Sequence, residues 1–293
     1  MSQEIELKLA VDHAGLTALP RLALLAAGAE SPRSLTNTYF DTPDGDLERA
    51  RVALRIRRVD GRCLQTLKTS GAGSGGLSQR GEWEWPIDGP ELDLDGLAAL
   101  LPMRDLDAAT LGALTPRFRT DFQRRTWQLR HPDSHIELAV DEGEIVAAGR
   151  RAEICELELE LKDGTVAALW QLAESLAEQV ALRPAQASKA ARGAALGANQ
   201  WALPEEEDSP RACFDRAMAA LDAYRDSRQA SFIEAAHASL ARLAVSADDR
   251  DTQDLARRTV QGLDAHGRLD LAGGQAALAL AQRLADWRIR RIP

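Results

Sequence analysis

The chain opens with a strict alternation of charged and apolar positions. Glu4, Glu6 and Lys8 are separated by single aliphatic residues. Successive side chains of a β-strand point to opposite faces, so the three charged groups share one face of a predicted strand. The apolar face must pack against a core, and the charged face therefore points either to solvent or into a polar cavity.

The same alternation recurs along the first two-thirds of the chain. Period-2 patterning and a high content of Thr, Val, Tyr and Trp predict eight strands, over residues 3–11, 34–40, 52–59, 62–69, 79–88, 118–130, 135–142 and 152–162. Asp60-Gly61 predicts a hairpin between the third and fourth strands, and Glu142-Gly143 predicts a turn after the seventh.

Helical patterns occupy two stretches of this region and the C-terminal part of the chain. Helices are expected over 13–28 and 165–182, the second with Thr165 at its N-cap. The acidic segment 204–210 is bracketed by prolines and is interpreted as a linker. Residues 211–293 are rich in Ala, Leu and Arg and predict about four helices. We therefore expect a strand-rich domain over 1–203 and a small all-α domain over 211–293.

Charges on the predicted strands are sorted by sign from strand to strand. Basic residues occupy one face of several strands: Arg55 and Arg57, then Lys68, then Arg124. Acidic residues share a face of others: Glu82 and Glu84; Glu137 and Asp141; Glu156, Glu158 and Glu160. A solvated surface is the ordinary explanation for one such strand. The sorting over many strands instead favours a closed sheet whose lumen holds a cation on carboxylates and a polyanion on basic groups.

Composition narrows the classes of protein that fit. The chain has 293 residues, is 45% hydrophobic and 28% charged, and is therefore expected to be globular. Its net charge of -9 argues against non-specific nucleic-acid binding. Scattered cysteines, the absence of a signal-like start and the absence of a long apolar run predict a cytoplasmic protein without a membrane span. The glycine-rich segment 70–76 matches no nucleotide-binding loop and predicts a flexible loop at a tunnel mouth.

The ordered set of motifs resembles the CYTH, or triphosphate tunnel metalloenzyme, superfamily. The resemblance covers about residues 1–200 and rests on Glu4-x-Glu6-x-Lys8, Asn37 to Pro43, Arg55-Ile-Arg57, Thr66-Leu-Lys68, Cys155-Glu-Leu-Glu-Leu-Glu and Ser188-Lys-Ala-Ala-Arg-Gly193. Several stretches are similar to bacterial members that act as inorganic triphosphatases and often carry a C-terminal helical CHAD domain. The helical part of this chain is expected to be a reduced or diverged CHAD-like domain.

The resemblance implies a fold, a reaction and a set of site residues. The fold is α+β, an eight-stranded antiparallel β-barrel with flanking helices, and the reaction is metal-dependent hydrolysis of inorganic triphosphate to diphosphate and phosphate. Mg²⁺ or Mn²⁺ would be held by six carboxylates: Glu4, Glu6, Glu156, Glu158, Asp141 and Glu137. Substrate binding and catalysis would fall to Lys8, Arg55, Arg57, Lys68, Arg124 and Lys189, with Arg192 as a further substrate contact. Secondary roles are expected for Glu82, Glu84, Glu160 and Tyr39, and for Tyr39 core packing is preferred.

Other functions stay open at this point. A thiamine triphosphatase, a nucleoside triphosphatase or a class IV adenylate cyclase would use the same tunnel. A non-catalytic polyphosphate-binding module belongs to a different class, and such an anion binder would have no use for the acidic pairs. In every case the expected partner is a triphosphate-containing small molecule rather than a nucleic acid or a membrane, and the helices allow a homo-oligomer.

Overall fold

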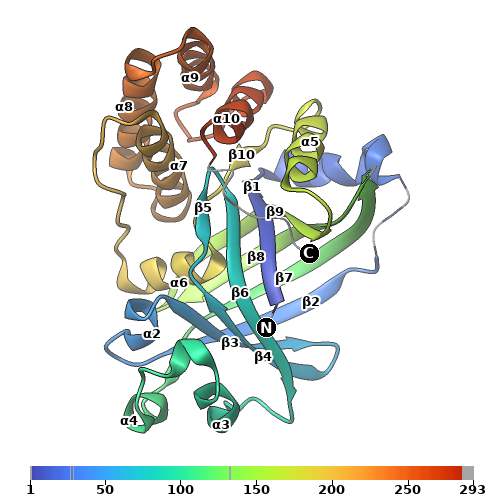
Figure 1. The fold of residues 1–293 in the computed structure, drawn as a ribbon, viewed down its shortest axis with the longest axis vertical. Coiled ribbons are helices and arrows are strands. Elements are labelled where there is room, and N and C mark those ends of the chain that lie inside the picture. Colours follow the sequence, from blue (N-terminus) through green and yellow to red (C-terminus); the bar gives the residue numbers. More distant parts are fainter. Residues whose placement is uncertain (1, 27, 29, 132, 286–293) are drawn as a thin grey trace.

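A closed antiparallel β-barrel forms the body of the protein (Figure 1). The computed structural model describes residues 2–26, 28, 30–131 and 133–285. Eight long strands run around the barrel in the order β1, β9, β8, β7, β2, β3, β4, β6, and β6 pairs with β1 to close it. They are β1 (Ser2–Ala10), β2 (Arg33–Asp41), β3 (Val52–Val59), β4 (Arg62–Thr69), β6 (Leu77–Ile87), β7 (Thr115–His131), β8 (Ser134–Ala147) and β9 (Arg150–Asp163). The predicted eight-stranded barrel is confirmed.

Two short strands extend the barrel sheet. β5 (Ala72–Ser74) pairs with β6, and β10 (Arg183–Pro184) pairs with β1. β5 lies within the glycine-rich segment 70–76, so the prediction of a loop is wrong for residues 72–74, while the residues on either side of β5 are coil or turn. The backbones approach so closely that a Cβ at Gly73 would overlap the carbonyl oxygen of Leu77, which explains a glycine at this position.

The main hydrophobic core lies outside the barrel rather than inside it. Ile5, Leu7 and Leu9 of β1 are fully buried, and they pack with apolar side chains of β8, β9 and the surrounding helices. The helix α5 (Val166–Ala177) covers this outer face with residues such as Trp170. Because the outer face of each strand packs into this core or into one of two smaller apolar clusters, alternation turns the charged side chains inward.

Several predicted boundaries differ from the structure for local reasons. The expected helix over 13–28 is broken into α1 (His13–Ala18) and two 3₁₀ turns, η1 (Leu19–Arg21) and η2 (Ala23–Leu25). Pro20 has no N–H to donate within a longer helix, and it lies at the start of the first 3₁₀ turn. The second expected helix ends at Ala177, and Thr165 occupies its N-cap position without a side-chain hydrogen bond.

One predicted turn is confirmed and the other is wrong. Asp60 and Gly61 both have positive φ angles, 50° and 75°, as a tight hairpin requires. β8 continues through Gly143 and turns only at Ala148-Gly149. Gly143 is needed within the strand because a Cβ there would overlap the backbone of Asp121 on β7.

Small helices complete the barrel domain. They lie at its rims and in its connections: α2 (Asp46–Arg49), α3 (Leu94–Ala98), η3 (Leu101–Met103), α4 (Ala108–Gly112) and α6 (Lys189–Ala198). α6 contacts β7, β8 and β9 and begins beside the barrel lumen. Its Ser188 N-cap accepts a hydrogen bond from the Ala191 N–H at 3.1 Å, which fixes the first turn that carries Lys189.

Four helices follow in the described C-terminal part, as predicted. They are α7 (Pro210–Ser227), α8 (Ala230–Ser246), α9 (Arg250–Gly262) and α10 (Leu271–Leu284), and they lie together beside one end of the barrel (Figure 1). Their apolar side chains join the same core cluster as β1, β8 and β9. The division into domains at 203 and 211 stays a prediction. Within the described residues, no helix combines the length and apolarity that crossing a membrane requires.

Close packing of α6 on the barrel gives a testable pair of substitutions. A Cβ at Gly193 would overlap the Phe118 ring of β7, whereas the nearest neighbour of a Cβ at Gly197 is 3.6 Å away. Gly193→Ala is therefore expected to lower the free energy of unfolding by about 1–3 kcal/mol through overpacking. Gly197→Ala on the same helix should leave it unchanged or raise it. Urea denaturation of both variants tests this, and equal effects would contradict the packing described.

Candidate active site

The barrel lumen is a cavity of about 860 Å³ lined by charged side chains from all eight long strands and from α6. Most of the predicted site residues line it: Glu4, Glu6, Lys8, Tyr39, Arg55, Arg57, Lys68, Glu82, Glu84, Arg124, Glu137, Glu158, Glu160 and Lys189. Asp141, Glu156 and Arg192 are buried and are not among the lining residues. A cavity of this size accommodates a small polyanion together with ions and water.

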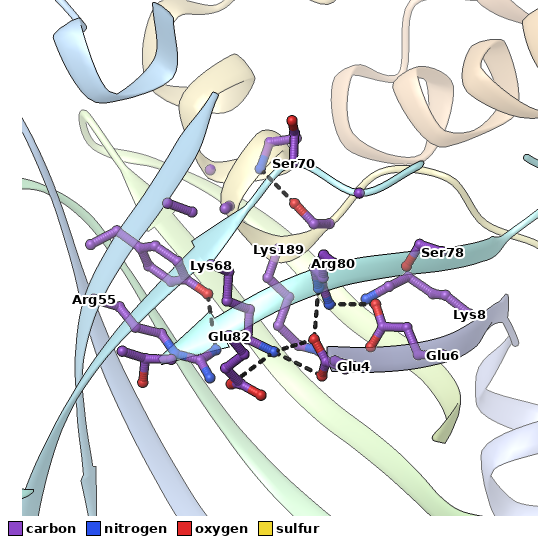
Figure 2. A pocket seen from close by; sticks show the side chains of 18 of the residues that line it. Glu4, Glu6, Lys8, Arg55, Lys68, Ser70, Ser78, Arg80, Glu82 and Lys189 are labelled. Carbon is purple, nitrogen blue, oxygen red and sulfur yellow. Dashed lines mark hydrogen bonds and ion pairs between the residues drawn. The ribbon is translucent and has the colours of Figure 1, made fainter. Parts of the chain in front are cut away.

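Arg80 joins the carboxylates of β1 and was missed by the sequence reasoning. Its guanidinium donates to Glu4 Oε2 at 2.7 Å and also to Glu6, as Figure 2 shows. Lys68 Nζ donates to both carboxylate oxygens of Glu4 at 2.8 Å. Arg80 lies on the same face of its strand as Glu82 and Glu84, and this alternation could have identified it from the sequence. Its pairing opposite Glu4 depends on the closure of β6 onto β1, which the sequence does not display.

The pKa of Glu4 follows from these contacts. Burial raises the pKa of this carboxyl, but Lys68 and Arg80 outweigh burial and lower it from 4.5 to about 2. Glu4 therefore stays ionised well below neutral pH, as a cation ligand or a partner of basic groups must.

A second ionic cluster surrounds Glu158 on β9. Its carboxylate accepts hydrogen bonds from Lys8 Nζ at 2.7 Å, Arg124 Nη2 at 2.6 Å and Lys189 Nζ at 3.0 Å. Burial raises the pKa of Glu158, but Lys189 and Lys8 lead the charges that bring it well below its usual range. Three predicted phosphate-binding residues thus converge on one predicted metal ligand.

Asp141 and Glu156 lie beneath this cluster. Arg124 binds both oxygens of Asp141, at 2.7 and 2.6 Å, and Lys189 Nζ lies 2.6 Å from Asp141 Oδ2. Glu156 is fully buried, contacts Lys189, and lies 3.7 Å from Lys8. Its Oε1 accepts no hydrogen bond of good geometry from the described residues, although the lysines are near.

Arg55 and Arg57 differ from the other basic residues of the lumen, because no carboxylate of the described residues lies within 4.0 Å of either guanidinium. Arg55 Nη1 donates to the Tyr39 hydroxyl at 3.4 Å, and its buried Nε has no acceptor among the residues that the structure describes. Arg57 Nε donates to Asn37 Oδ1 at 3.0 Å. Burial, with repulsion from Arg55, lowers the pKa of Arg57 to about 10, which still leaves it charged at neutral pH. One buried and one half-buried cation, neither with a carboxylate partner in the described part of the chain, favour an anion in the lumen.

The secondary residues surround these groups. Glu82 lies 3.1 Å from Lys68 Nζ, and Glu84 accepts from the Thr66 hydroxyl at 2.9 Å. Tyr39 stacks on Phe118 with ring centroids 4.5 Å apart, so it packs as well as lining the lumen. A further group combines Glu160 with Lys162 at 2.7 Å and Glu137 with Lys162 at 3.5 Å. Burial raises the pKa of Glu160.

Arg192 is placed where it does not reach the lumen. Its side chain is 1% exposed, and it binds both carboxylate oxygens of Asp226 on α7, at 2.9 and 2.7 Å. A direct contact with substrate would require this ion pair to break. Linear spacing gave no sign of Asp226, because the partner lies 34 residues away on a different helix.

The lumen offers carboxylate oxygens to a hard divalent cation. Asp141, Glu156 and Glu158 each place an oxygen within 4.8 Å of the others, and Glu4 and Glu6 line the cavity nearby. This all-oxygen donor set fits Mg²⁺ or Mn²⁺ in kind. A second set of side chains brings nitrogen, oxygen and sulfur ligand atoms within 4.8 Å of one another: His13, Glu153 and Cys155. There burial raises the pKa of Cys155 to about 11, which keeps the thiol protonated at neutral pH.

Fold and lumen together define a protein of the CYTH domain family, to which this chain belongs: residues 2–194 match it. Members of the family use divalent metal ions. Among curated relatives, the inorganic triphosphatase of Haemophilus influenzae is 38% identical over 203 residues. The match covers 69% of this chain and 57% of that protein, so this chain spans little more than half of the relative's length.

A solved structure gives a similar fold. A putative adenylyl cyclase from Hippeastrum, described as having a dominant triphosphatase activity, superposes with a TM-score of 0.51 at 24% identity. The superposition covers 69% of this chain and 98% of the other. At this identity the likeness supports the tunnel fold alone.

The ionised tunnel acids predict a specific dependence of stability on pH. Because the pKa of Glu4 is about 2 in the folded state and near 4.5 otherwise, its contribution is full above about pH 4.5 and is lost as the pH falls toward 2. Urea denaturation from pH 7 to 3 should show a falling free energy of unfolding below about pH 4.5. Glu4→Gln should flatten that fall, whereas Glu160→Gln, at a group with a raised pKa, should not. Identical pH profiles for the two variants would contradict this assignment.

Proposed function

We propose that this protein hydrolyses inorganic triphosphate to diphosphate and phosphate in the barrel lumen, with a divalent metal ion. The observation that carries the proposal is the sorting of charge across one enclosed cavity. Arg55 and Arg57 lack carboxylate partners among the described residues, while carboxylates gather on β1 and β9. The relationship to the Haemophilus influenzae inorganic triphosphatase supports the same reaction.

In the proposed complex, the basic residues bind the phosphate oxygens. Arg55 and Arg57 present guanidinium forks that suit pairs of phosphate oxygens, and Tyr39 holds Arg55 in place. Lys8, Lys68, Arg124 and Lys189 already have carboxylate partners, and a polyanion would share them. Charge that develops on the transferred phosphoryl group would thereby be stabilised by groups fixed in advance.

The metal would be held by the acidic side of the lumen. We assign Glu4, Glu6, Glu158 and Glu137 as ligands that reach the cavity, with the buried Glu156 and Asp141 as the remaining members of the set. A bound Mg²⁺ or Mn²⁺ neutralises phosphate charge and acidifies coordinated water. Glu82, Glu84 and Glu160 would hold the basic side chains in position or orient water.

Phosphoryl transfer to water needs positioning and electrostatic stabilisation more than a covalent nucleophile. The lumen supplies both through ion pairs of the barrel strands. The substrate is enclosed, which keeps these charge interactions strong by limiting contact with bulk water.

The proposal is tested by measuring phosphate release from inorganic triphosphate, ATP and thiamine triphosphate, with Mg²⁺ or Mn²⁺ and with a chelator. The highest kcat/KM is expected for inorganic triphosphate, with no activity in the chelator. A preference for ATP with conversion to cyclic AMP and diphosphate would instead identify a cyclase, and a preference for thiamine triphosphate would identify that phosphatase. Tight polyphosphate binding without turnover would support a binding module and contradict the proposal.

A further inference from the structure

Helix α7 holds the backbone that leads into α6. Asp222 Oδ2 on α7 accepts the N–H groups of Gln186 at 2.8 Å and Ala187 at 3.0 Å. Its other oxygen accepts from Arg183 Nη2 at 2.8 Å. All of this lies in the interior, where Asp222 is only 2% exposed. The turn immediately before the N-cap of α6 is therefore fixed by a side chain from beyond the family match, which ends at residue 194.

Four residues along α7, Asp226 holds the helix itself. Its carboxylate and the Arg192 guanidinium form a buried bidentate pair at 2.9 and 2.7 Å. Arg192 lies three residues after Lys189, so the two side chains share a face of α6. Whatever fixes Arg192 also fixes the rotation of the helix that carries Lys189.

The Asp226–Arg192 pair continues into the lumen. Arg192 Nη1 donates to Glu156 Oε2 at 3.5 Å, and the other oxygen of Glu156 faces Lys189. Lys189 in turn contacts Asp141 and Glu158 on the cavity side. An unbroken series of charged contacts thus runs from Asp226 through Arg192 and Glu156 to Lys189.

Arg225 supports the two aspartates of α7. Its Nη2 lies 3.9 Å from Asp222 and its Nε 3.7 Å from Asp226. The three guanidinium nitrogens are buried and make no hydrogen bond with the described residues. Burial raises the pKa of Asp222, but Arg183 and Arg225 outweigh burial and keep it below the usual value. Asp222 can therefore remain charged in the interior.

We propose that α7 is a positioning element of the active site, in which Asp226 and Asp222 hold α6 so that Lys189 is aimed into the lumen. The inference rests on the proposed triphosphate hydrolysis. It gives the first helix of the C-terminal region a role in the reaction. We call the contacts of Asp222 and Asp226 with the start of α6 the clamp. A small displacement of a positioned charge strongly reduces the stabilisation of the transition state. Loss of the clamp therefore lowers kcat, while the barrel residues that bind substrate stay in place.

A double-mutant cycle on the full chain tests the clamp. Asp226→Asn keeps the shape of the side chain and removes its charge, and it is measured alone and together with Lys189→Ala. We expect Asp226→Asn to lower kcat for inorganic triphosphate about tenfold or more in the wild-type background, with a smaller change in KM. In the Lys189→Ala background the same change should have less than about a twofold effect, since Asp226 acts through Lys189. Asp226→Glu, which retains the charge, should recover part of the loss.

Controls separate positioning from folding. Leu240→Ala on α8 removes a fully buried side chain of the main apolar core, which includes no residue of α6, so it should lower the melting temperature and leave kcat at 20–25 °C unchanged. If Asp226→Asn is too unstable to assay, Asp222→Asn takes its place in the cycle.

The outcomes distinguish this inference from the proposed function. An active wild type with kcat unchanged in Asp226→Asn, or with equal losses in both backgrounds, would overturn the clamp and leave the function standing. A wild type without turnover would overturn both.

Discussion

Arg55→Ala and Arg57→Ala are each expected to lower kcat for inorganic triphosphate by a factor of about 10²–10³. Both guanidinium groups face the cavity, and neither has a carboxylate partner within 4.0 Å among the described residues. In the proposed complex they are the cations most available to the phosphate oxygens. Steady-state phosphate release at saturating Mg²⁺ measures the effect.

The matched control is Arg119→Ala, an exposed arginine of β7 that pairs with Asp121 outside the set that lines the lumen. It should keep wild-type activity. Stability provides a second contrast: burial and repulsion from Arg55 act against the charge of Arg57, so Arg57→Met should raise the melting temperature while activity falls. A fall in both would contradict the view that Arg57 is retained for binding.

Glu156→Gln is expected to lower the free energy of unfolding by about 3–5 kcal/mol, because it breaks a buried ionic network from one side. Glu156 is fully buried among Lys8, Lys189 and Arg192, and the change leaves these cations with one anion fewer. Denaturation in urea at neutral pH measures the loss.

Glu160→Gln makes the same chemical change on the same strand, at a partly exposed residue paired with Lys162. That variant should lose less than about 1 kcal/mol, as surface pairs do. Similar losses at the two positions would show that burial of the ionic network does not set the stability of β9.

The face of each strand could be predicted from the sequence, because period-2 alternation is a local property. Glu4, Glu6 and Lys8 line the lumen for the same reason that their aliphatic neighbours enter the outer core. Strand ends were less predictable, since Gly143 marks a close approach inside β8 rather than a turn. The single helix predicted over 13–28 was wrong because Pro20 interrupts it, and that proline was visible in the sequence.

Partners across the closed sheet and between helices could not be predicted. Arg80 meets Glu4 only because β6 closes the barrel onto β1. Arg192 shares the motif that carries Lys189, so its charge alone suggested substrate binding. In the structure it is paired with Asp226, and no periodicity connects residues of α6 to those of α7. Parity thus identifies which residues face inward, while the choice between a substrate and an ion-pair partner requires the three-dimensional structure.

A phosphorus NMR time course of inorganic triphosphate tests the central claim most directly. It is recorded with Mg²⁺ for the wild type, for the wild type with chelator, and for Glu4→Gln/Glu6→Gln. The tunnel account predicts that the wild type converts triphosphate to diphosphate and phosphate in equal amounts, and that the chelator and the double substitution each stop the conversion. Unchanged triphosphate with the folded wild-type protein and Mg²⁺, or equal conversion by the double variant, would contradict it.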